Sequence, residues 1–241
     1  MNLTFATAGR VLAQLRADRR TIALIVVLPC LLIGLIAWMF EDNEMVLDRF
    51  GPVLVGIFPL IVMFLVTSVA TLRERQSGTL ERLMTTPIRK GDFVAGYALA
   101  FAVLSLLQAV VVVGWSVWLG MDVEGPLWLV FVVAVLVAIL GCTLGLGASA
   151  LARTEFQAVQ MMPAIVLPQL ITCGLLMPRD QMPEILEWLS RVLPLTYAVD
   201  AMQNLAAGEE WEGIQGSVGV IGLFIVGAVV LGVLTLRRRT A

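Results

Sequence analysis

Three glutamines share one apolar stretch of the chain with two prolines and two adjacent methionines. Gln157, Gln160 and Gln169 carry no charge, so the chemistry open to them is hydrogen bonding in apolar surroundings. Methionine side chains adapt to guests of irregular shape, so Met161 would suit a bulky apolar compound. The stretch is a candidate binding surface, although glutamines inside apolar segments more often join helices to one another.

Two residues in other apolar stretches extend this set. Gln108 lies close to Ser105, and Phe64 stands near the middle of its own segment. Each has the same structural alternative as the glutamines above. The candidates for a substrate pathway are therefore Phe64, Gln108, Gln157, Gln160, Met161 and Gln169.

The residues needed for most enzymatic chemistry are missing. The chain has no histidine, and its three cysteines, Cys30, Cys142 and Cys173, lie far apart in apolar runs, which is not the spacing of a metal site. Lys90 is the only lysine and does not follow a glycine-rich turn, so there is no GxxxxGK(S/T) phosphate loop. We predict no catalytic residue, no metal site and no ATP hydrolysis by this chain alone.

The elements that position these residues are membrane-spanning helices. Hydrophobic residues make up 59% of the 241 residues and charged residues only 14%, which is more apolar surface than a soluble domain could bury. A helix needs about 20 residues to cross the hydrocarbon core. Charge-free windows of about that length occur at 21–40, 52–72, 93–119, 127–151, 156–177 and 216–236. The predicted fold is an all-α integral membrane protein with six transmembrane helices in one transmembrane domain, residues 1–241.

The positions of the charged residues predict how the chain is oriented in the membrane and which energy source could drive transport. Thirteen of the 16 Lys and Arg residues lie in the N-terminal segment, the second and fourth connections and the C-terminal tail. The positive-inside rule places these parts in the cytoplasm, so both termini should be cytoplasmic. The windows themselves hold no ionisable residue, which argues against ion-driven transport.

The second connection, residues 73–92, is longer than a turn requires. Leu80, Leu83 and Met84 recur at helical spacing, and a residue that precedes a proline is pushed out of the helical region, here just ahead of Pro87. This predicts a short amphipathic helix at about 77–86. Such a helix would either couple the protein to a partner or lie on the lipid headgroups, and the residues alone favour neither.

The fifth connection predicts an external helical hairpin at about 178–212. Pro183 followed by Glu184 is a good helix start, Pro194 breaks that helix, and Thr196 can cap a second one. Both helices are apolar on one side. They should either pack on or dip into the outer half of the bundle, or lie as surface helices on the membrane.

Two shorter features concern packing. Gly141 and Gly145 form a GxxxG pair, which permits close approach of helices either within one bundle or between subunits. Residues 2–18 predict an N-terminal interfacial helix whose apolar side is formed by Phe5, Ala8, Leu12 and Leu15.

Two stretches resemble a known family. Residues 74–87 read ERQSGTLERLMTTP, which agrees at every fixed position with the E-x-x-x-G-T-L-E-x-L-x-x-T-P pattern of the type-2 family of bacterial ABC exporter permeases. Residues 174–200 resemble the external segment ahead of the last span in the same family, although Thr172-Cys173 stands where a Phe-Ser pair is usual. The order of spans and the two long connections agree as well, so the resemblance covers the whole chain.

The resemblance implies partners and a location. A dimer of permeases, either identical or paired with a related chain, would bind two ABC ATPase subunits in the plasma membrane of a bacterial cell. Those subunits would hold ATP and Mg²⁺, no cofactor would bind this chain, and no nucleic acid would be involved. The helix at 77–86 would be the coupling helix, docked in a groove of the ATPase. The residues implied in coupling are Glu74, Gly78, Thr79, Leu80, Glu81, Leu83 and Pro87.

The expected function is ATP-driven export of an amphipathic drug-like or lipid-like compound, because a pathway without charge offers little to a strongly ionic cargo. Export of a lipid-linked glycan is the alternative within the family. It would favour aromatic residues along the pathway, and Phe64 and Trp115 stand near span centres. From another class, the chain could be a membrane scaffold or sensor that transports nothing.

Overall fold

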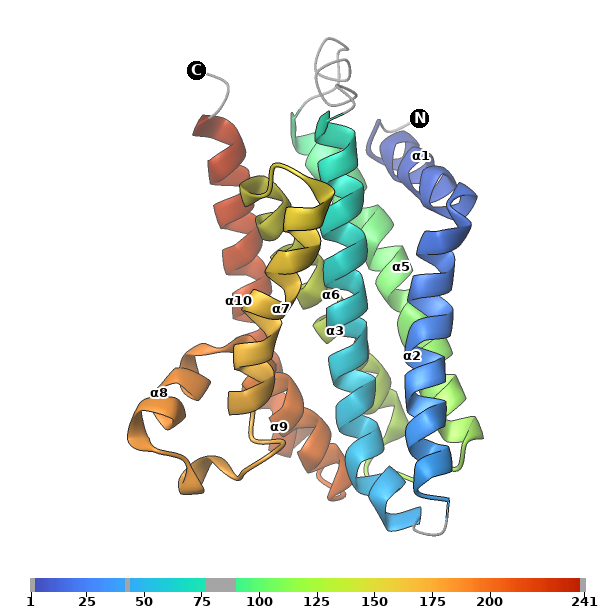
Figure 1. Ribbon diagram of the computed structural model, residues 1–241, viewed down its shortest axis with the longest axis vertical. Helices are drawn as coiled ribbons and strands as arrows, with labels where there is room; N and C mark the ends of the chain where they lie inside the picture. Colours follow the sequence, from blue (N-terminus) through green and yellow to red (C-terminus); the bar gives the residue numbers. More distant parts are fainter. Residues whose placement is uncertain (1–2, 42–43, 77–89, 239–241) are drawn as a thin grey trace.

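The computed structural model describes residues 3–41, 44–76 and 90–238, and the regular elements in these ranges are helices. In chain order they are α1 (Leu3–Ala17), α2 (Arg19–Met39), α3 (Glu44–Gln76), α5 (Lys90–Trp118), α6 (Leu127–Leu151), α7 (Glu155–Thr172), the 3₁₀ turn η1 (Arg179–Gln181), α8 (Glu184–Val192), α9 (Pro194–Ala206) and α10 (Trp211–Arg238). The long helices run between the two ends of one bundle (Figure 1). We call these ends the α1 end, which also holds the C-terminal part of α10, and the α9 end.

Five of the described helices are long and apolar enough to cross a membrane. The qualifying segments are Thr21–Met39, Phe50–Gln76, Gly96–Trp118, Leu127–Leu151 and Trp211–Val230, so five of the six expected spans are confirmed as candidates. The remaining window, 156–177, corresponds to α7, which ends at Thr172. Its 18 residues extend about 27 Å at 1.5 Å per residue, and its glutamines make it less apolar than its neighbours. A sixth crossing therefore stays a prediction.

Two helices begin more than one turn earlier than the charge-free windows indicated. α3 begins at Glu44 rather than Pro52, and α10 begins at Trp211 rather than Gly216. A charge-free window marks only the residues that tolerate lipid. The helix continues past it for one or two turns, where charged side chains are free to reach water.

The centre of the bundle is the crossing of α3 and α6. A Cβ built on Gly141 would collide with the backbone of Leu60, and one on Gly145 with the backbone of Phe64. The GxxxG pair therefore packs α6 directly onto α3, which is the use within one bundle. Leu60 and Phe64 are fully buried there.

The outer faces of the long helices are apolar and uncovered within the chain. Val27 of α2, Leu107 of α5 and Leu223 of α10 are each at least half exposed. An apolar surface that continues over several helices is costly in water and suits contact with lipid.

α1 forms as predicted, and most of its predicted apolar side packs on the bundle. It packs on α5, and Gly96 of α5 makes room for Thr7, whose Cβ lies 2.6 Å from where a Cβ on the glycine would stand. Thr7, Ala8, Val11 and Leu15 are buried, while Phe5 is 64% exposed. Ala8 and Leu15 of the predicted apolar side pack on the bundle together with Leu12, whereas Phe5 of the same side stays exposed.

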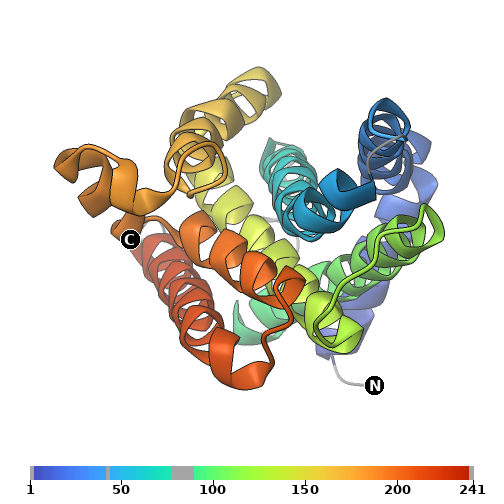
Figure 2. The same cartoon turned by 90° about the horizontal axis from the view of Figure 1, so that it is seen from below.

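The predicted hairpin divides between the two expected arrangements. α9 dips into the bundle at the α9 end (Figure 2) and contacts α3, α6, α7 and α10, and its Leu195, Met202 and Leu205 are fully buried. α8 stays at the surface, with Ile185 80% and Trp188 67% exposed. Thr196 does not cap α9 as predicted, because α9 begins two residues earlier with Pro194 in its first turn.

Candidate functional site

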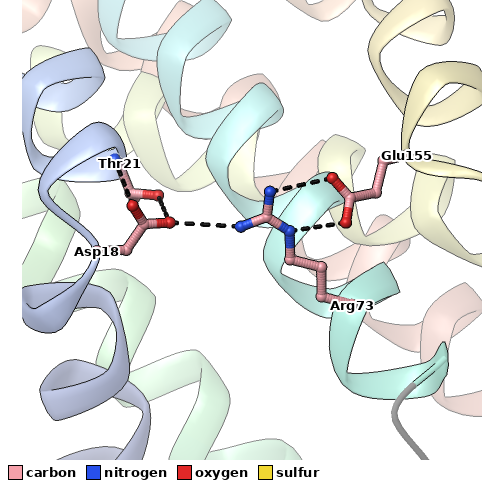
Figure 3. A network of polar contacts seen from close by, with 4 residues as sticks. All are labelled: Asp18, Thr21, Arg73 and Glu155. Carbon is pink, nitrogen blue, oxygen red and sulfur yellow. Dashed lines mark hydrogen bonds and ion pairs between the residues drawn. The ribbon is translucent and has the colours of Figure 1, made fainter.

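The last turn of α3, Arg73 to Gln76, binds several other elements at the α1 end. Arg73 makes the widest connection. Its Nε and Nη2 donate to Oε1 and Oε2 of Glu155 at 2.8 and 3.0 Å, and its Nη1 donates to Oδ2 of Asp18 at 3.3 Å. Figure 3 shows the guanidinium between the two carboxylates, one from the link between α1 and α2 and the other from the first turn of α7.

Asp18 also caps the start of α2. Its Oδ1 accepts from the backbone N–H of Thr21 at 3.4 Å, and its Oδ2 accepts from the Thr21 hydroxyl at 3.0 Å. These bonds satisfy a backbone donor in the first turn of α2, as an N-cap side chain does. Arg73 is thereby joined to the start of α2 as well as to α7.

Glu74 ties α3 to the N-terminal helix. Its Oε1 lies 3.3 Å from Nη1 of Arg10, whose Nη2 donates to the Tyr97 hydroxyl at 3.1 Å. Arg10 belongs to α1 and Tyr97 to α5. One arginine thus connects three helices.

The last two residues of the turn reach α6 and the link that follows it. Arg75 donates to the carbonyl of Ser149, and Nε2 of Gln76 donates to the carbonyl of Arg153 at 2.7 Å. Gln157 stabilises the same link, because its Oε1 accepts from the N–H of Arg153 at 2.9 Å. A displacement of the α3 end would therefore be transmitted to α1, α2, α6 and α7.

The electrostatics of the pair with Arg73 favour the charged form of Glu155. Hydrogen bonds from Arg73 hold the pKa of Glu155 below its ordinary value, against a smaller opposing effect of burial. Charge-assisted bidentate pairs of this kind fix geometry as well as charge. Lowering the pH through the reduced value would protonate Glu155 and loosen the pair.

One of the predicted coupling residues lies in the part of the chain that the structure describes, and the other six lie outside it. Glu74 lies in the last turn of α3, where it pairs with Arg10. Gly78, Thr79, Leu80, Glu81, Leu83 and Pro87 lie outside the described residues. Arg73 to Gln76 directly precede that segment, and α5 begins at Lys90 directly after it.

The six candidates for a substrate pathway do not come together. Phe64 and Gln108 are fully buried in the bundle, and Gln169 is 3% exposed near the α9 end. Gln157, Gln160 and Met161 lie on the first two turns of α7, and the two glutamines are exposed. Of the set, only these three share one place on the surface.

Gln169 has a structural contact that the sequence did not reveal. Its Nε2 donates to the Ile165 carbonyl at 3.0 Å, and its Oε1 accepts from the backbone N–H of Leu195 at 3.3 Å. Leu195 is in the first turn of α9, where backbone N–H groups lack a partner within the helix. Gln169 thus fastens α9 to α7.

The sequence also missed the main partners of the network, Asp18, Glu155 and Arg10. Two local signals were available: Asp18 three residues ahead of Thr21, and Thr154 followed by Glu155, both typical of helix starts. Neither reveals a contact with Arg73, which is 82 positions from Glu155. Among the described residues, no group of three His, Cys, Asp or Glu side chains could hold a metal ion.

Comparison with known proteins identifies the family. Residues 3–206 match the ABC-2 type transporter family. The chain is 31% identical over 166 residues to ABC transporter G family member 20 of Dictyostelium discoideum, a match that covers 68% of this chain and 23% of that protein.

Two bacterial relatives agree. A probable multidrug ABC transporter permease of Escherichia coli (strain K12), YbhS, is 27% identical over 156 residues, 64% of this chain and 41% of the relative. Nodulation protein J of Rhizobium leguminosarum bv. trifolii is 28% identical over 169 residues, 67% of this chain and 62% of the relative. The chain thus spans less than two thirds of each relative. The match over residues 3–206, together with helices long and apolar enough to cross a membrane, makes this chain a permease of the ABC-2 type transporter family.

Proposed function

We propose that this chain is the membrane subunit of an ATP-driven exporter and that its ATPase is a separate polypeptide. The observation that carries the proposal is the last turn of α3. Four consecutive residues bind other elements there, directly ahead of the segment that resembles a coupling helix. A rigid-body displacement at that point would pass into several helices at once.

The proposal assigns the α1 end to the cytoplasm. The concentration of arginine in the N-terminal segment, the second and fourth connections and the tail supports this orientation. With α7 as a sixth crossing, both termini are cytoplasmic and the α8–α9 hairpin is external. The expected location is the plasma membrane of a bacterial cell.

The expected partners are two ABC ATPase subunits, which bind ATP and Mg²⁺, and a second permease chain, identical or related. Residues 77–86 dock on the ATPase as the coupling helix, with Glu81 facing its basic residues. Replacement Glu81→Arg should weaken the complex by about 2–5 kcal/mol if the pair is buried. The exposed external Glu210 offers a matched reversal, Glu210→Arg, that should leave ATPase binding unchanged.

The cargo we expect is an amphipathic drug-like or lipid-like compound. The Escherichia coli relative YbhS, a probable multidrug permease, supports this class. The exposed Gln157 and Gln160 offer hydrogen bonds without charge. A lipid-linked glycan is less well supported, because Phe64 is buried and the indole N–H of Trp115 already donates to the Cys30 carbonyl at 2.8 Å.

The test is reconstitution. The chain is purified alone and with the ATPase that copurifies from its own host, and both preparations are placed in liposomes with ethidium as a probe. We expect ATP turnover and ATP-dependent ethidium movement only with the ATPase present. ATP hydrolysis by the chain alone would contradict the proposal that the ATPase is a separate polypeptide. A stable complex that hydrolyses ATP but moves neither ethidium nor a panel of lipophilic compounds would favour a scaffold or sensor.

A further inference from the structure

We propose that Arg73 is a positioning residue for transport, which fixes the first turn of α7 relative to α3 and carries movement of the α3 end into α7. This inference rests on the proposed function, which it deepens by naming the residue that transmits the displacement. The same end of α7 also presents the exposed Gln157 and Gln160.

The geometry of the guanidinium is the first support. Two of its nitrogens bind both oxygens of Glu155, and a third binds Asp18. The guanidinium is planar, so its donors point in fixed directions. Through this one rigid group, the start of α2 and the start of α7 keep a set position relative to α3 (Figure 3).

The packing of α7 is the second support. Among the described residues of α7, only Ala158, Val166, Gln169 and Thr172 are buried. Near the α1 end, Phe156 is 70% exposed, and the local apolar cluster is small, consisting of Leu72, Ala152, Ala158 and Met161. The bidentate ion pair, whose side chains are 53% and 43% exposed, adds a directional contact to this small cluster at the first turn of α7.

The surroundings leave the Arg73 side chain room to move. A cavity of about 270 Å³ lies beside it, lined in part by Val11, Asp18 and Tyr97. If the guanidinium moved, Asp18 would keep both donors of Thr21, whereas the hydrogen bonds that Glu155 makes in the described part of the chain all come from Arg73. Movement of Arg73 would therefore remove the side-chain hydrogen bonds of Glu155 while the start of α2 stays capped.

The test compares Arg73→Lys and Glu155→Gln with the wild type. Lysine keeps the charge but donates from a single point, so it cannot bind both carboxylates in the same way. The matched control is Arg191→Lys on α8, where Arg191 Nη2 lies 2.5 Å from Glu187 Oε1 within one exposed helix. Spin labels at Gln14 in α1 and Gln160 in α7, in a background with the three cysteines replaced by alanine, report the position of α7.

The first readout needs no transport. We expect Arg73→Lys and Glu155→Gln to broaden the Gln14–Gln160 distance distribution of the chain alone, with the Arg191→Lys distribution unchanged. The second readout is ethidium moved per ATP hydrolysed by the reconstituted complex. It should fall about 2- to 30-fold, the range seen for residues that carry coupling between sites, while ATPase recruitment stays normal.

The outcomes separate the inference from the function it rests on. A wild-type complex without ATP-driven transport defeats the proposed function, and the distance distributions then decide on Arg73 by themselves. If the wild type transports and Arg73→Lys matches it in both readouts, Arg73 does not position α7. A double variant Arg73→Lys/Glu155→Gln that is no worse than either single variant would show that the two residues act as one pair.

Discussion

A Cβ built on Gly145 of α6 would lie 2.5 Å from the carbonyl oxygen of Phe64 on α3. No side chain separates the two helices at this point, so the contact is between backbones. Phe64 is fully buried, and the same helix pair repeats the contact one turn away at Gly141 and Leu60. The spacing of α3 from α6 is therefore set by these two glycines.

Replacement Gly145→Ala should destabilise the bundle, since one added methyl group forces backbone atoms apart. Overpacking of this kind costs about 1–3 kcal/mol. The control is Gly147→Ala on the same helix, where the added Cβ meets no described atom within 4 Å and alanine favours the helix by about 1 kcal/mol. Thermal unfolding in detergent should show a lower Tm for Gly145→Ala and an equal or higher Tm for Gly147→Ala. Equal losses in both variants would rule out a specific α3–α6 contact.

Replacement Gln169→Leu should destabilise the attachment of α9. Leucine keeps roughly the same volume but leaves the buried N–H of Leu195 without its acceptor, and an unsatisfied buried donor costs about 1–3 kcal/mol. The exposed Gln160→Leu is the control, with a Tm close to that of the wild type. If Gln169 lines the pathway instead, Gln169→Leu will change which compounds are transported while Tm stays constant.

The positions of most helices could be predicted from the sequence. Charge-free windows predicted the long helices because a charge inside lipid is costly, and Pro183 and Pro194 marked the helices of the hairpin because proline lacks a backbone donor. The same window signal missed the residues from Glu44 to Gly51, which are helical but tolerate charge.

Contacts between distant residues were beyond the sequence. Gln108, Gln157 and Gln169 are alike in type, yet one is buried in the bundle, one holds the α6–α7 link and one fastens α9. The pairing of Arg73 with Glu155 depends on which helices become neighbours. Local propensity and spacing do not carry that information.

Labelling at Arg153 and Glu210 should decide whether α7 crosses the membrane. Both positions are exposed, and α7 is the only long helix between them among the described elements. A membrane-impermeant maleimide should react with a Glu210→Cys protein in intact cells and with an Arg153→Cys protein only after permeabilisation. Both variants are made in a background with the three native cysteines replaced by alanine, because Cys30 is only partly buried. Reaction of both from the same side would show that α7 does not span, and the reversed pattern would invert the orientation.

The free energy of unfolding should fall as the pH rises through the pKa of Asp200, although Asp200 forms an ion pair with Arg179. Arg179 Nη2 lies 2.7 Å from Oδ2 of Asp200, but burial raises the pKa of Asp200 above 3.8, and the attraction of Arg179 offsets only part of that effect. The folded protein therefore binds this proton more tightly than the unfolded chain does. For such a group the free energy of unfolding falls as the pH rises from the ordinary value through the raised one.

Replacement Asp200→Asn should remove this dependence. Near pH 3.5 the two proteins should have similar Tm values, because both carry a neutral side chain. As the pH rises, the Tm of Asp200→Asn should increase relative to the wild type and then level off above the raised pKa. The exposed Asp180→Asn in the adjacent 3₁₀ turn serves as the control. The opposite result is also informative. If the wild type gains stability over Asp200→Asn as the pH rises from about 4 to about 7, above the ordinary carboxyl pKa, attraction to Arg179 outweighs burial at this site.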